Sequence, residues 1–234
     1  MQLKGLLIST LLFISASAAA QTRVAADVEE KTVMDGKAVT RTSELYCTSA
    51  GNLVQVFSGD PSYYVLTNLS GEFKAYFPKS NEVYSDRRDD FSTKDNIFYL
   101  FMSGHSDDLG LSMYGYRLAS STTDEDGLLK RTYLPTSKAP KGTAKIELVL
   151  EDYLPIYVGY YDKAGRLVSK SYISSYRQFP SVTLPQRITS ISYTSAKDST
   201  IVRTLYSHIR IDGSEPMFDF RIPEGATPKK LFDR

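Results

Sequence analysis

The stretch KIELVLE, residues 145–151, shows most clearly the pattern that decides the fold. Apolar Ile146, Leu148 and Leu150 alternate with charged side chains. Successive side chains of a β-strand point to opposite faces, so one face of this segment is apolar and the other is exposed to solvent. The stretch therefore predicts a strand of an antiparallel sheet that is covered on one side.

The same period of two extends from this stretch in both directions. Leu154 to Tyr161 alternates in the same way, and a turn at Lys163-Ala164-Gly165 leads into a returning strand. Near the beginning, Asp35-Gly36 separates two β-rich segments and is a strong hairpin signal. We count about ten or eleven antiparallel strands, too many for a flat open sheet, so we expect the sheet to curl toward a barrel or form two layers.

Two stretches interrupt this rhythm. Between Asp86 and Gly115 the apolar residues recur at helical spacing, which predicts two short helices over 96–102 and 109–114. Gln178 to Leu184 is flanked by Pro185 and contains another proline, so we expect a connector or an edge strand there. The chain shows no internal repeat or linker, so we predict one domain over residues 21–234.

Residues 1–20 have the composition of a signal peptide. Lys4 precedes an apolar run of about a dozen residues, which is shorter than the roughly 20 that a transmembrane helix needs. Ala18-Ala19-Ala20 then supplies a small-residue cleavage site. We expect a secreted, soluble mature chain that begins near Gln21 and resides in the periplasm.

The composition of the mature chain argues against a nucleic-acid or polyanion partner. The sequence has 28 basic and 27 acidic residues, and one of the basic residues, Lys4, would leave with the signal peptide. The mature chain is then formally neutral and has no excess positive charge with which to bind nucleic acid. Cys47 is the only cysteine, so internal disulfides are excluded. The 17 Tyr and 11 Phe suit sheet faces and binding surfaces.

Three short motifs carry a resemblance to a known family. They are LSGEFKAYFP at 69–78, IFYLFM at 97–102 and MFDFRIPEGA at 217–226. Together with the order signal, meander, helical break and second meander, they resemble the outer-membrane lipoprotein carriers, the periplasmic LolA-like proteins. The resemblance spans the mature chain and implies a strongly curved antiparallel sheet, an incomplete barrel with short lid helices.

One departure from the family concerns the start of the third strand. The carriers have an Arg-Pro pair there, whose arginine latches the lid, and this chain instead reads AGNLV at 50–54. Loading by the inner-membrane export ATPase is therefore not implied.

In this resemblance, an apolar concave cavity takes acyl chains out of water. Each buried methylene contributes about 0.8 kcal/mol. The sequence leaves open which strand parity faces the cavity, because a slip of one residue exchanges the faces. Ordinary core packing is the alternative role for each candidate. The residues that we expect to line the cavity are Tyr64, Leu66, Phe73, Phe98, Phe101, Met102, Met113, Tyr116, Ile146, Leu148, Val158 and Tyr160.

Chemistry other than binding has little support in the sequence. Ser103, His105, Asp107 and Asp108 lie close together, but a polar loop often produces such a group without catalysis. Asp124 opens a stretch similar to the front of a calcium loop, but Pro135 stands where the loop would need its glutamate. We expect no enzyme activity, no metal and no cofactor.

The sequence thus favours a periplasmic carrier or sensor of lipoproteins or acyl lipids that serves outer-membrane biogenesis. The expected partners are an acylated lipoprotein or lipid and an outer-membrane receptor or another envelope protein, and we expect a monomer. The alternative is an envelope protein–protein interaction or regulatory module that has the same fold and carries no lipid.

Overall fold

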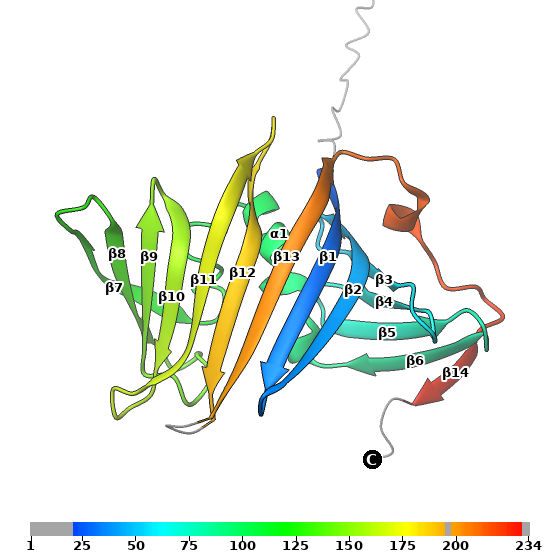
Figure 1. Ribbon diagram of the computed structural model, residues 1–234, viewed down its shortest axis with the longest axis horizontal. Coiled ribbons are helices and arrows are strands. Elements are labelled where there is room, and N and C mark those ends of the chain that lie inside the picture. The colour runs from blue at the N-terminus through cyan, green and yellow to red at the C-terminus, as the bar shows by residue number, and fades with distance from the viewer. Residues whose placement is uncertain (1–20, 195–197, 231–234) are drawn as a thin grey trace, which may run out of the picture.

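The computed structural model describes residues 21–194 and 198–230, so the expected signal peptide at 1–20 lies outside the described residues. Fourteen strands form one sheet in the order β14-β6-β5-β4-β3-β2-β1-β13-β12-β11-β10-β9-β8-β7 (Figure 1). The strands are β1 (Arg23–Met34), β2 (Lys37–Thr48), β3 (Leu53–Phe57), β4 (Tyr63–Thr67), β5 (Glu72–Phe77), β6 (Glu82–Arg87), β7 (Tyr116–Thr123), β8 (Leu129–Pro135), β9 (Lys145–Glu151), β10 (Leu154–Tyr161), β11 (Leu167–Gln178), β12 (Thr183–Tyr193), β13 (Ser199–Ile211) and β14 (Thr227–Lys230).

The sheet is strongly curved and open, which confirms the predicted fold class. Its first and last strands, β14 and β7, do not pair with each other. The strand count is larger than the expected ten or eleven, and the pairing is mixed because β14 runs parallel to β6. Thr227–Lys230 carries no alternation of apolar and polar residues, so sequence period could not identify it as a strand.

The two ends of the meander meet in the middle of the sheet. β1 pairs with β2 on one side and with β13 on the other, and Val24 lies opposite Ile211. The β1–β2 hairpin closes at Asp35 and Gly36, whose φ angles of 51° and 72° fit the left-handed turn that this dipeptide favours. The chain thus forms two wings, β2–β6 and β7–β12, joined along β1 and β13.

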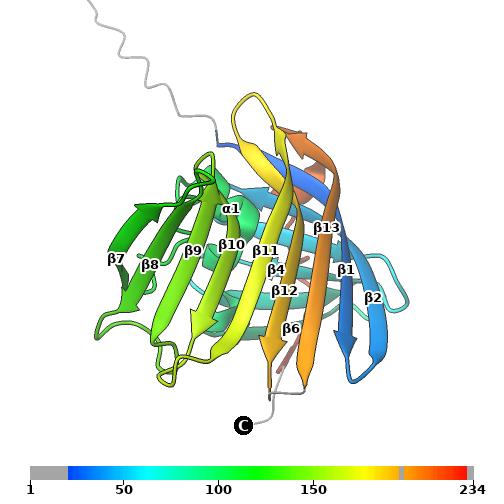
Figure 2. The same ribbon diagram turned by 60° about the vertical axis from the view of Figure 1, so that its left-hand side comes forward.

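The helical break becomes an insertion, residues 89–115, that lies inside the curve of the sheet. Figure 2 shows α1 (Ile97–Met102) between the wing of β7–β11 and the strands β4 and β6. Two 3-10 helices, η1 (Asp89–Phe91) and η2 (Thr93–Asp95), precede it. We call the face of the sheet that holds this helical insertion the concave face. Among the described residues, none of the helices has the length and hydropathy to cross a bilayer.

The second expected helix, 109–114, is wrong. The segment is a run of turns in which several amides bond the carbonyl three residues back, such as Met113 to Gly110 and Tyr114 to Leu111. Leu109 and Gly110 have φ angles of 49° and 73°, which no right-handed helix accommodates. The apolar spacing was correct, but the backbone at these two residues prevents a helix.

The connector expected at Gln178–Leu184 is confirmed only for residues 179–182, and the alternative of an edge strand is wrong. β11 continues to Gln178 and β12 begins at Thr183, and a turn closed by the Phe179 amide on the Val182 carbonyl joins them. Pro185 is buried and lies opposite Tyr176 in β12, an internal strand. It lies near the beginning of the strand, where a proline is tolerated.

The segment after β13 crosses the opposite, convex face. We call residues 212–226 the C-terminal strap; it contains η3 (Pro216–Asp219) and ends at the edge strand β14 (Figure 1). Phe218 is buried against the edge of the Tyr46 ring, with 5.4 Å between centroids. The strap thereby gives the convex face a small apolar cluster of its own, made with Ala25 and Val54.

Candidate functional site

The helical insertion is fixed to the sheet at its beginning. The Thr93 amide donates to the Asn68 carbonyl at 3.1 Å, and the hydroxyls of Thr93 and Thr67 lie 3.2 Å apart. The Ser92 hydroxyl donates to the Leu69 carbonyl at 3.0 Å. These bonds join the insertion to the β4–β5 hairpin and place the start of α1 over the concave face.

The sequence of α1 explains why it forms although it has only six residues. The Asn96 side chain caps it, accepting hydrogen bonds from the amides of Phe98 and Tyr99 at 3.0 and 3.3 Å. All residues from Ile97 to Phe101 are buried. A helix this short is marginal by itself, so its burial stabilises it more than its propensity does.

The first apolar cluster of the concave face surrounds α1. Phe98 is completely buried, with its ring centroid 4.6 Å from that of Tyr206, and Phe101 lies 6.0 Å from Tyr176. Cys47 belongs to the same cluster, and burial raises the pKa of its thiol to about 12. Burial likewise raises the pKa of the Tyr206 hydroxyl. The Cys47 thiol and the Tyr206 hydroxyl therefore remain uncharged at neutral pH, as an apolar interior requires.

A second apolar cluster covers the concave side of β7–β10. It is built on Ile146, Leu148 and Leu150, which are completely buried, and Leu111 of the insertion packs on it. Leu109 contacts both clusters. The insertion is thus the element that joins the two wings across the curve of the sheet.

A hollow of 630 Å³ lies where the insertion approaches the loop after β8. Met113 and Tyr114 line it from the insertion, and Lys138 and Pro140 line it from the loop. The Tyr114 hydroxyl is buried. This burial, and to a smaller extent the Asp95 carboxylate, raise the pKa of the hydroxyl. This hollow is an opening at the rim of the interior, with apolar and polar groups side by side.

The structure gathers most of the expected cavity residues on the concave face. Phe73 packs on Phe91 of the insertion, with 4.7 Å between ring centroids. Phe98, Phe101 and Met102 belong to the first cluster; Tyr116, Ile146, Leu148, Val158 and Tyr160 belong to the second.

Tyr64, Leu66 and Met113 lie elsewhere. Leu66 pairs with Val54 and packs in the convex cluster, and Tyr64 lies against Phe220 of the strap, with 4.9 Å between centroids. They are one residue out of phase with the concave side chains of β4. Met113 is 36% exposed and lines the hollow at the rim.

An aromatic row on the concave face was missed in the sequence. Phe57 stacks on Tyr63 at 4.5 Å, Tyr63 lies 5.5 Å from Phe77, and Phe77 lies 5.6 Å from Tyr84. The row crosses β3, β4, β5 and β6, and the last three rings are only partly buried. The repeated aromatic residue in each of four consecutive strands is the signal that would have identified it.

The polar groups weighed for other chemistry have structural roles. Asp108 accepts hydrogen bonds from the amides of Gly110 and Ser112, and Asp107 pairs with Arg131. Asp124 accepts from the amides of its own turn and pairs with Lys130 at 2.9 Å, which lowers the pKa of its carboxyl. Residues 21–194 and 198–230 contain no cluster of three or more potential metal ligands.

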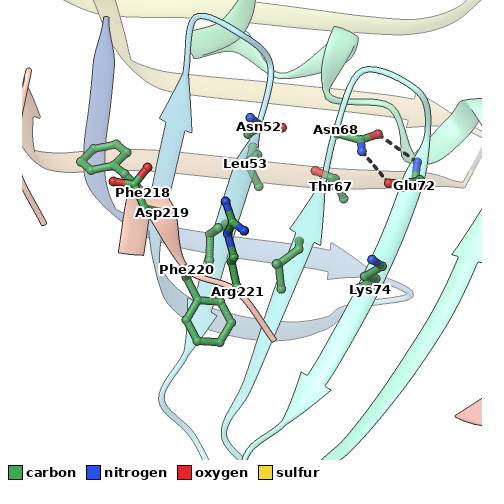
Figure 3. A pocket seen from close by; sticks show the side chains of 12 residues that line it. Asn52, Leu53, Thr67, Asn68, Glu72, Lys74, Phe218, Asp219, Phe220 and Arg221 are labelled. Atoms are coloured by element: carbon green, nitrogen blue, oxygen red, sulfur yellow. Dashed lines mark hydrogen bonds between the residues drawn. The ribbon is translucent and has the colours of Figure 1, made fainter. Parts of the chain in front are cut away.

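A separate groove of 280 Å³ lies on the convex face, between the strap and the strands β3–β5 (Figure 3). Val54 and Leu66 contribute its apolar surface, and Arg221 and Lys74 contribute positive charge. Figure 3 shows Arg221 extended over β3 and β4, with Lys74 on β5 beyond them. The sequence had assigned Leu66 to the concave cavity, and the structure places it in this groove.

Comparison with known proteins identifies the fold. No family model and no curated protein matches the chain. A DUF1329 family protein from Desulfovibrio piger is similar in structure, with a TM-score of 0.58 and 16% identity over 86% of this chain and 90% of that one.

Two further solved structures match over most of their length. A putative outer membrane lipoprotein-sorting protein domain from Vibrio parahaemolyticus has a TM-score of 0.55 and 15% identity, covering 82% of this chain and 86% of that one. A LolA superfamily protein from Nitrosomonas europaea has a TM-score of 0.54 and 11% identity, covering 85% and 90%. These likenesses show a LolA-like fold.

Proposed function

From this LolA-like fold, we propose that the protein is a non-enzymatic binding protein of the bacterial periplasm that carries or senses lipoproteins or acyl lipids. It reaches the periplasm through a cleaved signal peptide at residues 1–20, and the remaining chain acts as one domain and as a monomer. An acyl chain enters the concave face, where the helical insertion now lies. An outer-membrane receptor or another envelope protein is its second partner.

The observation that carries this proposal is the way the insertion fills the curve of the sheet. Its apolar side chains, among them Phe98, Phe101 and Leu111, occupy the place that acyl chains would take. Hydrogen bonds at Ser92 and Thr93 hold its beginning and the Arg131–Asp107 pair holds its later part, so entry of an acyl chain would break the contacts at one of these two places.

Two features around the insertion fit an acyl ligand. The aromatic row of Phe57, Tyr63, Phe77 and Tyr84 extends the apolar surface beyond the insertion on the same face. A dozen methylenes buried along such a surface contribute about 10 kcal/mol before ordering costs. Because exposing a buried phenylalanine side chain costs about 3 to 5 kcal/mol, that gain offsets the displacement of about two such side chains of the insertion.

The test is uptake of a fluorescent fatty acid, together with native mass spectrometry of protein purified from the envelope. We expect bound acylated species and saturable uptake, which Phe101→Asp weakens at least tenfold while the far-ultraviolet circular dichroism stays that of a β-sheet protein. Val39→Asp is the matched control, because Val39 is 63% exposed at the end of a hairpin.

Two outcomes contradict the proposal. An empty purified protein that also fails to bind the fatty acid saturably contradicts lipid binding. Unfolding of the Phe101→Asp protein means that Phe101 belongs to the permanent core and that the insertion is no lid. Leu109→Asp, which alters the contact between the two clusters and not α1 itself, repeats the measurement at an independent position.

The alternative is a protein–protein interaction or regulatory module with no lipid cargo. The complete burial of Phe98, Ile146 and Leu148 favours it, because side chains of the chain itself then constitute a finished interior. Recovery of one stoichiometric protein partner from envelope extracts, without bound lipid, selects this function over the carrier.

A further inference from the structure

The convex groove beneath the C-terminal strap is built independently of the apolar interior. Residues 218–221 of the strap form one side, and side chains of β3, β4 and β5 form the other. No part of the helical insertion lines it. Whatever binds here is therefore distinct from a ligand of the concave face.

The strap is held firmly where it borders the groove. The Arg23 guanidinium donates two hydrogen bonds of 3.1 Å to the Asp219 carboxylate and lies 5.4 Å from the centre of the Phe218 ring. On the other side, Phe220 packs edge-on against Tyr64. These contacts fix residues 218–220, which directly precede Arg221, so its guanidinium is presented from a rigid base.

The charges in the groove are unevenly paired. Both acidic groups have hydrogen-bond partners. The Asp219 carboxylate binds Arg23, and the Glu72 carboxylate accepts from the side-chain amide of Asn68 at 2.8 Å. In the part of the chain that the structure describes, Arg221 and Lys74 form no ion pair. Arg23 compensates the charge of Asp219, so Arg221 and Lys74 face a single uncompensated carboxylate, that of Glu72, and this excess of positive charge is complementary to an anion.

We propose that this groove binds the anionic head of an amphiphile, a phosphate or a carboxylate that is attached to an apolar chain. Arg221 takes two oxygens of the head through its planar fork, and Lys74 supplies a second positive charge. The Asn52 side chain borders the same space and offers a polar contact. Val54, Leu66 and Phe220 receive the first part of the apolar chain.

The size of the groove limits the ligand. Its 280 Å³ is close to the lower end of small-molecule sites, about 300 Å³. It therefore takes a head group with the adjoining methylenes, and the rest of the chain lies outside. The site does not depend on the proposed function of the concave face.

The test is isothermal titration calorimetry with dodecyl phosphate and with dodecanoate, each below its micelle concentration and at low salt. The two ligands distinguish a phosphate from a carboxylate head, and dodecyl maltoside is the uncharged control. The titrations are done in the Phe101→Asp protein as well as in the unaltered protein, so that uptake by the concave face is separated from binding in the groove.

We expect saturable binding that Arg221→Gln weakens at least tenfold and Lys74→Gln weakens severalfold in both backgrounds, with further loss at high salt. Arg221→Lys keeps the positive charge but loses the planar fork, so its affinity should lie between those of the unaltered and Arg221→Gln proteins. Lys79→Gln, at an exposed lysine outside the groove, should change nothing. Equal affinity of the unaltered and Arg221→Gln proteins, or equally tight binding of the maltoside, would overturn the proposal.

Discussion

Phe98 of α1 lies against Tyr206 of β13, with 4.6 Å between the ring centroids and 45° between the ring planes. The contact joins the helical insertion to one of the two strands that hold the wings together. This aromatic pair is one of the contacts through which the helical insertion packs on the centre of the sheet.

Phe98→Ala should lower the free energy of unfolding by about 3 to 5 kcal/mol, because it leaves a cavity where a completely buried ring now packs. Urea denaturation followed by circular dichroism measures the loss. Met113→Ala is the control within the insertion, and since Met113 is 36% exposed it should cost much less. A loss below about 1 kcal/mol for Phe98→Ala would mean that the interior closes over the gap.

Cys47 should report opening of the insertion. The thiol is completely buried in the cluster around α1 and its pKa is raised to about 12 by that burial, so alkylation at pH 8 should be slow. Thr93→Val removes the hydrogen bond to Thr67 and should speed alkylation severalfold, as measured by mass spectrometry.

The control for this measurement is Thr122→Val on the exposed edge strand β7, which should leave the alkylation rate unchanged. Equal rates in the Thr93→Val and unaltered proteins would show that Cys47 becomes accessible only by global unfolding and that the insertion does not open at its anchor.

Tyr160 should make stability fall at high pH. Burial raises the pKa of its hydroxyl from 10.0 to about 12, so between these values the unfolded chain has lost a proton that the folded protein keeps. Stability that is complete below pH 10 therefore declines as the pH rises toward 12. Tyr160→Phe should reduce the decline by up to about 1.4 kcal/mol per pH unit. Urea midpoints at pH 9, 10 and 11 measure it, and identical slopes would contradict the assignment.

Arg23 should hold the strap on the convex face. Arg23→Gln removes the two bonds to Asp219 and the contact with the Phe218 ring, and should cost about 1 kcal/mol because Asp219 is largely exposed. Limited proteolysis should then cut residues 212–226 faster than in the Arg117→Gln control. Unchanged cleavage would mean that the buried Phe218 alone secures the strap.

The sequence was most informative where side-chain period and turn chemistry agree. The alternation at 145–151 and the Asp35-Gly36 dipeptide each identified a strand or hairpin that the structure contains. The Phe-x-Phe motif at 217–226 pointed to the right fold, but its position on the convex face depends on contacts with Tyr46 and Tyr64 that no local pattern encodes.

Strand parity was the main limit for the candidate site. Tyr64 and Phe73 both alternate correctly within their strands, but they face opposite sides of the sheet, because pairing of Tyr64 with Tyr76 fixes a phase that the sequence does not reveal. The failed helix at 109–114 has a different cause. There the spacing was helical and the positive φ angles of Leu109 and Gly110 decided the outcome.

The pairing of Val24 with Ile211 also has a consequence for biogenesis. β1 is the first strand made, and its partner β13 is among the last, so the two can pair only after almost the whole polypeptide has been synthesised. Until then β1 presents an unprotected hydrogen-bonding edge that invites aggregation. The sheet is therefore completed late in synthesis, and a partner that covers this edge of β1 until then would suppress aggregation.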